Sequence, residues 1–297
     1  MQNLVTLELN SFRFGAAGLS RLRGKRMPRL RSLALSSCAL GDADAAHLAS
    51  LGLPSLRRLD LCYNELTDGA VSALAGAPWI SALTRLKLSE NEGVGDAGAA
   101  ALAAAPLRGL RALRIGGEGT RLTDAGVAAL AGAAWLTGLT ELKLSACYDR
   151  ADYLGSDRRA WAALAAAPLN ALRVLGLKFV RLQPDAAAAL GAAPWLQGLR
   201  SLTVERGSFL AIVEAAPHSC RGLLKRAGVT FSVAYNMALP VPSEDEGSSR
   251  PSDDAGDEGR EALADNEGSA AGDGFNCRSD GGGCGGGDDE GNGEAED

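Results

Sequence analysis

The sequence predicts an α/β solenoid in which short parallel strands cover one face and helices cover the other. A leucine pattern recurs at a nearly fixed spacing, and each copy is followed by an alanine-rich segment with helical features. Apolar residues make up 46% of the 297 residues and aromatic residues only 5%, which suits thin, closely stacked layers. The pattern stops where the composition changes. We therefore expect a repeat domain over 1–238 and a disordered acidic Gly/Ser-rich tail over 239–297.

The first half of each repeat predicts a short strand. Its pattern, Leu-x-x-Leu-x-Leu, ends in the alternation that is typical of a strand with one buried face. Successive first leucines lie 26 to 33 residues apart. The eight copies begin at Leu4, Leu30, Leu56, Leu83, Leu110, Leu139, Leu172 and Leu199. A plausible last edge strand, over 229–233, follows them.

The second half of each repeat predicts a helix. Segments 67–75 and 123–131 begin with Thr-Asp, which supplies an N-cap oxygen, and continue with alanine and one apolar face. Prolines follow these segments and are expected to stop the helices, because proline lacks the N–H and clashes with the preceding turn. They are Pro78, Pro106, Pro168 and Pro194.

One polar position after each strand is expected to be buried. Asn64 and Asn91 occupy it in two repeats, and Cys38 and Cys147 occupy it in two others. Stacked repeats bury the loop backbone, so a side chain here is needed to satisfy its polar groups. We interpret the two cysteines as structural rather than reactive.

Over about residues 1–235, L-x-x-L-x-L-x-x-N/C followed by T-D-x-G-[AV]-x-x-L-A resembles the ribonuclease-inhibitor-like class of leucine-rich repeats. Within that class it is similar to the alanine-rich GALA type of F-box and algal proteins. The resemblance implies a horseshoe with parallel strands on its concave face, acting as a non-enzymatic protein-interaction scaffold. It also implies substrate recognition for an F-box-type ubiquitin ligase, although an F-box is absent from residues 1–30. The alternatives are an axonemal or cytoskeletal scaffold, and an enzyme regulator resembling ribonuclease inhibitor or a GTPase activator.

Two parts of the chain depart from the repeat. Residues 148–156 are inserted between strand and helix, as a surface loop or as part of a binding rim. The chain also starts inside a repeat without a polar cap, as expected for a fragment of a longer protein. Trp161 follows the insertion and is expected at this rim. Other tryptophans alternate with leucine at one repeat position and are expected in the core; they are Trp79, Trp135 and Trp195.

The candidate partner-binding residues lie on the concave face. Residues between the consensus leucines point to this face, so Lys87, Arg114 and Lys143 are expected to form a ladder across adjacent strands. Acids such as Glu90 and Glu141 are near enough to offset their charge. The remaining candidates are Arg58, Arg85, Lys178, Tyr63 and Phe179. These residues form either a solvated basic face or a docking surface for a protein with an acidic segment.

Charge divides along the chain. The net charge of −6 combines +9 over residues 1–240 with −15 over 241–297. The tail is therefore a second candidate partner for the basic face, in an intramolecular contact. Nucleic acid is disfavoured, because Tyr63 and Phe179 are the only aromatic residues near the ladder for stacking.

No motif predicts catalysis, a cofactor or a metal. Of the two histidines, His47 is expected on a helix, facing solvent, and His218 lies two residues from Cys220, too close in sequence to form a dyad. The pair at Cys277 and Cys284 has no second pair to complete a zinc site. The glycine-rich segment 116–119 lacks the Gly-Lys-[Ser/Thr] ending of a P-loop.

The sequence suggests a cytoplasmic protein, with the ciliary axoneme or the nucleus as alternatives. No apolar segment is long enough for a membrane-spanning helix, and residues 1–5 do not begin a secretory signal. The six cysteines are scattered rather than arranged as a disulfide framework, as is usual in a reducing compartment.

Overall fold

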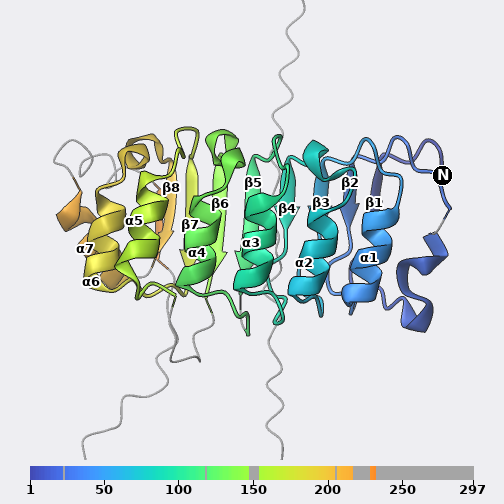
Figure 1. Cartoon of the computed structure of the whole chain (residues 1–297), viewed down its shortest axis with the longest axis horizontal. Coiled ribbons are helices and arrows are strands. Elements are labelled where there is room, and N and C mark those ends of the chain that lie inside the picture. The colour runs from blue at the N-terminus through green and yellow to red at the C-terminus, as the bar shows by residue number, and fades with distance from the viewer. Residues whose placement is uncertain (23, 118, 147–153, 205, 217–227, 232–297) are drawn as a thin grey trace, which may run out of the picture. The chain divides into compact units, whose positions relative to one another are not determined.

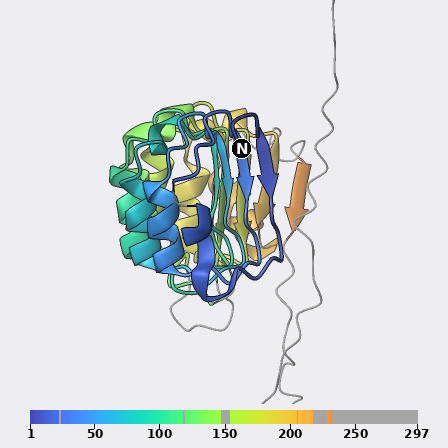
Figure 2. The ribbon, with the colours of Figure 1, turned by 90° about the vertical axis from the view of Figure 1, so that its right-hand side faces the viewer.

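A computed structural model describes residues 1–231 except residues 23, 118, 147–153, 205 and 217–227. The chain divides into two units, Met1–Leu239 and Pro240–Asp297. The second unit, with the expected tail, lies outside the described residues. Within the first unit, strands form one layer and helices the other (Figures 1 and 2).

The strand layer is a parallel sheet. Nine described strands pair in chain order, β1 to β9, and each repeat therefore adds one strand beside the last. The consensus leucines stay in register from strand to strand, as Leu33, Leu59 and Leu86 show. The strands are β1 (Thr6–Glu8), β2 (Ser32–Ala34), β3 (Arg58–Asp60), β4 (Arg85–Lys87), β5 (Ala112–Gly116), β6 (Glu141–Ser145), β7 (Val174–Lys178), β8 (Ser201–Val204) and β9 (Gly228–Phe231).

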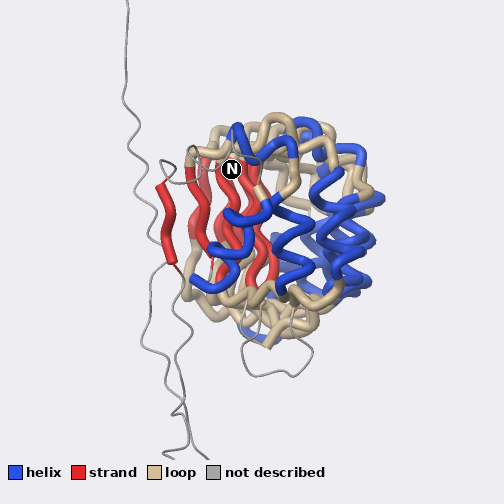
Figure 3. The backbone as a smooth tube through the Cα atoms, turned by 90° about the vertical axis from the view of Figure 1, so that its left-hand side faces the viewer, coloured by secondary structure: helices blue, strands red, loops and turns tan. Residues whose placement is uncertain are grey.

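The helices line the other face of the sheet (Figure 3). Each packs against the helices of the neighbouring repeats. The predicted α/β leucine-rich-repeat horseshoe is confirmed. The α-helices are α1 (Asp42–Ser50), α2 (Asp68–Ala75), α3 (Asp96–Ala104), α4 (Asp124–Ala131), α5 (Arg158–Ala166), α6 (Pro184–Gly191) and α7 (Arg206–Ala215). Short 3-10 turns are η1 (Gly15–Leu22), η2 (Ile80–Ala82), η3 (Ala134–Gly138) and η4 (Pro194–Gly198). No helix in the described ranges has the length and apolar character needed to cross a membrane.

The helix ends agree with the sequence signals in part. Thr67 caps α2 and Thr123 caps α4, each through its hydroxyl oxygen. The residues before Pro106 and Pro168 are extended, because the proline ring disfavours helical backbone in the preceding residue. Pro194 differs from the prediction. It opens η4 after α6 has already ended, since the first position of a helical turn needs no N–H.

A single apolar core runs between the two layers. Trp79, Trp135 and Trp195 are 3 to 5% exposed, so their predicted place in the core is confirmed. The expectation for Trp161 is wrong: it is 0% exposed, and its indole N–H donates to Asp124 of the preceding repeat. A polar partner in the core allows this side chain to be buried completely.

Candidate partner-binding surface

The ladder predicted on the concave face has the expected register. Lys87 on β4 pairs with Arg114 on β5, which pairs with Lys143 on β6. Neighbouring strands lie about 4.8 Å apart, so three cations occupy a short line across the sheet. Arg58 and Arg85 are likewise register partners on β3 and β4.

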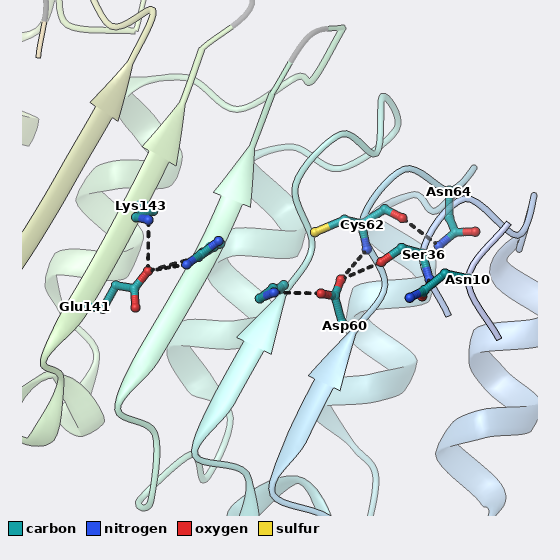
Figure 4. Close-up of polar contacts among 9 residues, drawn as sticks. Asn10, Ser36, Asp60, Cys62, Asn64, Glu141 and Lys143 are labelled. Atoms are coloured by element: carbon teal, nitrogen blue, oxygen red, sulfur yellow. Dashed lines mark hydrogen bonds and ion pairs between the residues drawn. The ribbon is translucent and has the colours of Figure 1, made fainter. Parts of the chain in front are cut away.

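Every cation of the ladder has an acidic partner. Lys87 Nζ lies 2.8 Å from a carboxylate oxygen of Asp60. Glu141 Oε1 lies 2.9 Å from Arg114 Nη2 and 3.2 Å from Lys143 Nζ. Figure 4 shows the Lys143 and Glu141 side chains directed at each other. Two carboxylates thus offset most of the charge of three cations, which leaves the ladder a weak attractor for an acidic ligand.

Both carboxylates are held in their charged form. Burial would raise the pKa of Asp60, but the hydrogen bond and charge of Lys87 and the bonds from Cys62 and Ser36 lower it below its usual value. Burial would also raise the pKa of Glu141, and the charges of Arg114 and Lys143 outweigh that effect and lower it. The offset therefore persists at neutral pH.

Asp60 also belongs to a hydrogen-bond network that joins three repeats. Its Oδ1 accepts the Ser36 hydroxyl at 2.9 Å and the Cys62 amide at 3.1 Å. The Ser36 amide in turn donates to Asn10 Oδ1 at 3.0 Å (Figure 4). These bonds hold together the carboxyl ends of β1 to β3, where the strands lead into the loops.

A different set of arginines gathers at the amino ends of β1 to β4. A recess of about 380 Å³ there contains Arg31, Arg57 and Arg58. Hydroxyl side chains complete its polar lining: Thr6, Ser32 and Thr84. No acidic side chain belongs to the lining. We call this the arginine recess. The sequence predicted Arg58 as a candidate but missed Arg31 and Arg57, which lie at the second position of the leucine pattern.

The aromatic candidates do not stand beside the ladder. Tyr63, 44% exposed, lines a rim recess of about 640 Å³ together with Glu65, Glu90 and Glu92. The ring of Phe179 makes a cation–π contact with the preceding residue, Lys178, whose Nζ lies 4.8 Å from the ring centroid. Neither of these two described aromatic side chains therefore offers the ladder a platform on which a base would stack.

Tyr63 and Phe179 share a strained backbone position. Both have a left-handed φ near +60°, as does the residue two places after the last consensus leucine in other repeats. In this turn the chain leaves the strand, and the amide N–H of the residue donates to a carbonyl of the neighbouring repeat. The Tyr63 amide, for example, donates to the Ser89 carbonyl at 3.0 Å. The residues are Ser11, Ser37, Tyr63, Glu90 and Phe179.

The asparagine position is confirmed as a buried backbone clamp. Asn64 is 7% exposed; its Oδ1 accepts the amides of Cys38 and Leu40, and its Nδ2 donates to three carbonyls. Asn91 is 0% exposed; one repeat later its Oδ1 accepts one amide, that of Leu66, and its Nδ2 donates to three carbonyls. Cys38 substitutes with one thiol donor to the Leu9 carbonyl at 3.0 Å. Cys147 lies outside the described residues.

A second polar position, at the first residue of the helices, was missed in the sequence. There an aspartate accepts hydrogen bonds from backbone amides of the following repeat. Asp96, for example, accepts the Thr123 amide at 2.8 Å, the Thr123 hydroxyl at 2.6 Å and the Gly126 amide at 2.9 Å. The four aspartates are Asp42, Asp68, Asp96 and Asp124. The recurring Thr-Asp pair was the available signal, which we interpreted only as a helix cap.

Within the described ranges, no three metal-ligating side chains come together. Cys38 and Cys62 are buried and form no disulfide. His47 lies on α1, as expected, and is partly exposed. Gly116 and Gly117 have a structural reason to be glycine: a Cβ on Gly116 would stand 2.0 Å from the Ser145 carbonyl oxygen. The remaining candidates for chemistry lie outside the described residues: His218, Cys220, Cys277 and Cys284.

Comparison with known proteins agrees with this architecture. A family model described as Leucine Rich repeat matches residues 52–75, which cover β3 and α2, and residues 81–103, which cover β4 and all but the last residue of α3. A search of curated proteins found no match to the sequence. The family match, together with the register of the sheet, agrees with a leucine-rich-repeat fold.

Several solved structures resemble the chain at low identity. One, from the Rad7 and Elc1 complex in yeast, is 18% identical, with 63% of this chain and 61% of that chain covered and a TM-score of 0.34. An internalin (InlF) from Listeria monocytogenes is 17% identical, with 79% and 62% covered and a TM-score of 0.43. Human 5T4, trophoblast glycoprotein, is 21% identical, with 76% and 68% covered and a TM-score of 0.37. The chain thus spans less than two thirds of the first two.

Proposed function

We propose that this protein is a protein-interaction scaffold that binds its partner on the concave face of the sheet. One observation carries the proposal: polar side chains at the third and fifth positions of the pattern form an ordered, solvent-accessible array. Ser32, Arg85 and Lys143 are partly open to solvent, whereas Leu33, between two such positions, is 1% exposed. An array of side chains fixed by a rigid sheet recognises a surface with little loss of entropy on binding.

Photo-crosslinking from defined positions tests the proposal. A crosslinking amino acid replaces Ala34 or Thr203 on the concave face, and Ala46 or Ala100 on the convex helices in the matched controls. We expect one protein to be captured from both concave positions and from neither convex position. Equal capture from the two faces would contradict binding on the concave face.

The resemblance to repeats of F-box proteins supports a narrower form of the proposal, in which the scaffold recognises substrates for a ubiquitin ligase in the cytoplasm. Purification of the tagged chain from its own cells tests this: ligase subunits are expected with it. Copurification with axonemal or cytoskeletal complexes in the cilium would instead support the structural scaffold. A small GTPase whose hydrolysis the chain stimulates would support the enzyme regulator.

The acidic segment expected in the partner, and the contact expected with the tail, remain part of this proposal. The tail lies outside the described residues, so its role rests on charge alone. Deletion of 241–297 tests it. If the tail competes for the basic body, an acidic ligand binds the shortened chain more tightly than the full chain at low salt, and the difference disappears at high salt. Equal affinities would rule the competition out.

A further inference from the structure

The charges of the concave face are not equally available to a ligand. The central ladder is offset by Asp60 and Glu141. Arg31 makes no ion pair or side-chain hydrogen bond with a described residue. Arg57 uses one nitrogen, Nη1, on the Leu56 carbonyl at 3.1 Å. Arg31 and Arg57, which have no acidic partner among the described residues, therefore lie in the arginine recess, whereas each cation of the ladder has one.

We infer that the arginine recess is the anion-binding subsite of the concave face and takes an extended acidic protein segment. This inference rests on the proposed function and locates it within the sheet. Three guanidinium groups and three hydroxyl groups line the recess without an acid among them. Guanidinium groups bind carboxylates through paired, charge-assisted hydrogen bonds. The Thr6 and Ser32 hydroxyl groups add donors without adding a competing charge, whereas the Thr84 hydroxyl donates to the Arg57 carbonyl at 3.0 Å.

The spacing of the recess suits a peptide strand. Arg31 and Arg57 stand at equivalent positions of neighbouring repeats, and Ser32 and Arg58 are register partners beside them. Neighbouring strands lie about 4.8 Å apart, so the recess spans about 14 Å across β1 to β4. An extended segment rises about 3.3 Å per residue and covers this span with about four residues. A segment with an acid at every second or third residue would therefore place two carboxylates among the arginines.

The lining also selects against nucleic acid. It contains no aromatic side chain on which a base would stack, and Val5 is its one apolar side chain. Proteins that bind single strands combine a basic groove with aromatic stacking platforms. The recess supplies only the first of these, which favours a carboxylate-rich protein segment over RNA.

Fluorescence anisotropy with the full chain tests the inference. The probe is a labelled peptide of four Asp-Ser repeats, and a labelled eight-nucleotide oligouridylate is the nucleic-acid comparison. The recess variant is Arg31→Ser with Arg57→Ser. The matched control is Arg158→Ser with Arg159→Ser on α5, where both side chains are exposed on the convex face. Both variants lose two positive charges, and circular dichroism checks that both are folded.

We expect the recess variant to bind the acidic peptide at least tenfold more weakly than the unmodified chain at 50 mM salt, and the control to change less than twofold. Binding to the unmodified chain weakens at 300 mM salt, because exposed charges are screened. Equal losses in the two variants would mean that net charge alone attracts the peptide, and would overturn the inference. Tighter binding of the oligouridylate than of the peptide would also overturn it. No peptide binding at all, with crosslinking still confined to the concave face, would refute the subsite and leave the proposed function standing.

Discussion

Replacement of Asp124 by Asn is predicted to destabilise the middle of the solenoid. Asp124 is 7% exposed and accepts five hydrogen bonds from the following repeat. Its Oδ1 accepts the Gly155 amide at 2.7 Å and the Trp161 indole at 2.8 Å. Its Oδ2 accepts the Ser156 amide at 2.8 Å, the Ser156 hydroxyl at 2.9 Å and the Asp157 amide at 2.5 Å. This carboxylate thus joins α4 to the segment that leads into α5.

The magnitude follows from the donors that Asn leaves without an acceptor. An Asn side chain has the same shape but keeps one acceptor oxygen, which is best placed facing the three donors at Oδ2. Its NH₂ group then faces the Gly155 amide and the Trp161 indole, and both donors lose their partner. Each buried donor left unsatisfied costs about 1–3 kcal/mol. We expect a loss of about 3 kcal/mol, which corresponds to a fall in melting temperature of about 6–12 °C for a domain of this size.

Urea and thermal denaturation followed by circular dichroism measure the loss, and amide hydrogen exchange locates it. Exchange at Gly155 and Ser156 is expected to accelerate more than exchange in α2, because neighbouring repeats stabilise each other only locally. Asp185→Asn on α6 is the matched control. Asp185 is exposed in the first turn of its helix and bonds no described residue through its side chain, so we expect a change below about 0.5 kcal/mol. Equal losses in the two variants would refute the assignment of Asp124 as a link between repeats.

Four further predictions follow from the same structure. Because the pKa values of Asp60 and Glu141 are lowered in the folded state, their ion pairs stabilise the protein above about pH 4.5, and this stability is lost as the pH falls through the folded pKa values. Urea denaturation between pH 7 and pH 3 should therefore show a smaller fall in the free energy of unfolding for Glu141→Gln than for the unmodified chain. Ser37→Gly should raise the free energy of unfolding by up to about 1 kcal/mol because φ is 58°, whereas Ser37→Val should lower it, and a destabilising glycine would argue against strain in this turn. Asn91→Ala should cost about 3 kcal/mol by denaturation, since Asn91 satisfies one buried amide and three carbonyls, and a loss under 1 kcal/mol would contradict the clamp. Burial raises the pKa of the Cys38 thiol, so iodoacetamide followed by mass spectrometry should find it far less alkylated in the folded protein than in urea, and similar labelling in both states would contradict its structural role.

The fold was predictable because its signals are local and repeated. Leucines such as Leu59 and Leu86 recur at a fixed spacing, and the spacing alone sets the register of the sheet. The buried clamp at Asn64 was predictable for the same reason. Trp161 was placed wrongly because its burial depends on Asp124, a partner 37 residues away in another repeat. A hydrogen bond of that kind has no signature in the sequence near either residue.

The candidate site was predictable as a set of positions but not as a distribution of charge. The fifth position of the pattern predicted Lys87, Arg114 and Lys143 as neighbours, and the register of the sheet confirms that they lie on adjacent strands. Whether a cation is available to a ligand depends on its neighbours both along its own strand and across the adjacent strands. Asp60 lies directly beside Lys87 in the register, and Glu141, at the third position, reaches Arg114 diagonally.

The same two-dimensional view explains why the arginine recess is the better candidate for binding an acidic partner. A ligand that binds the ladder must compete with carboxylates only about 3 Å from the cations, and displacing them exposes those acids to the ligand's own negative charge. A ligand that binds Arg31 and Arg57 has no described carboxylate to displace, because no described acid pairs with either side chain. The ladder then acts mainly to hold β3 to β6 in a fixed geometry, and specificity for an acidic segment is decided at the amino ends of β1 to β4.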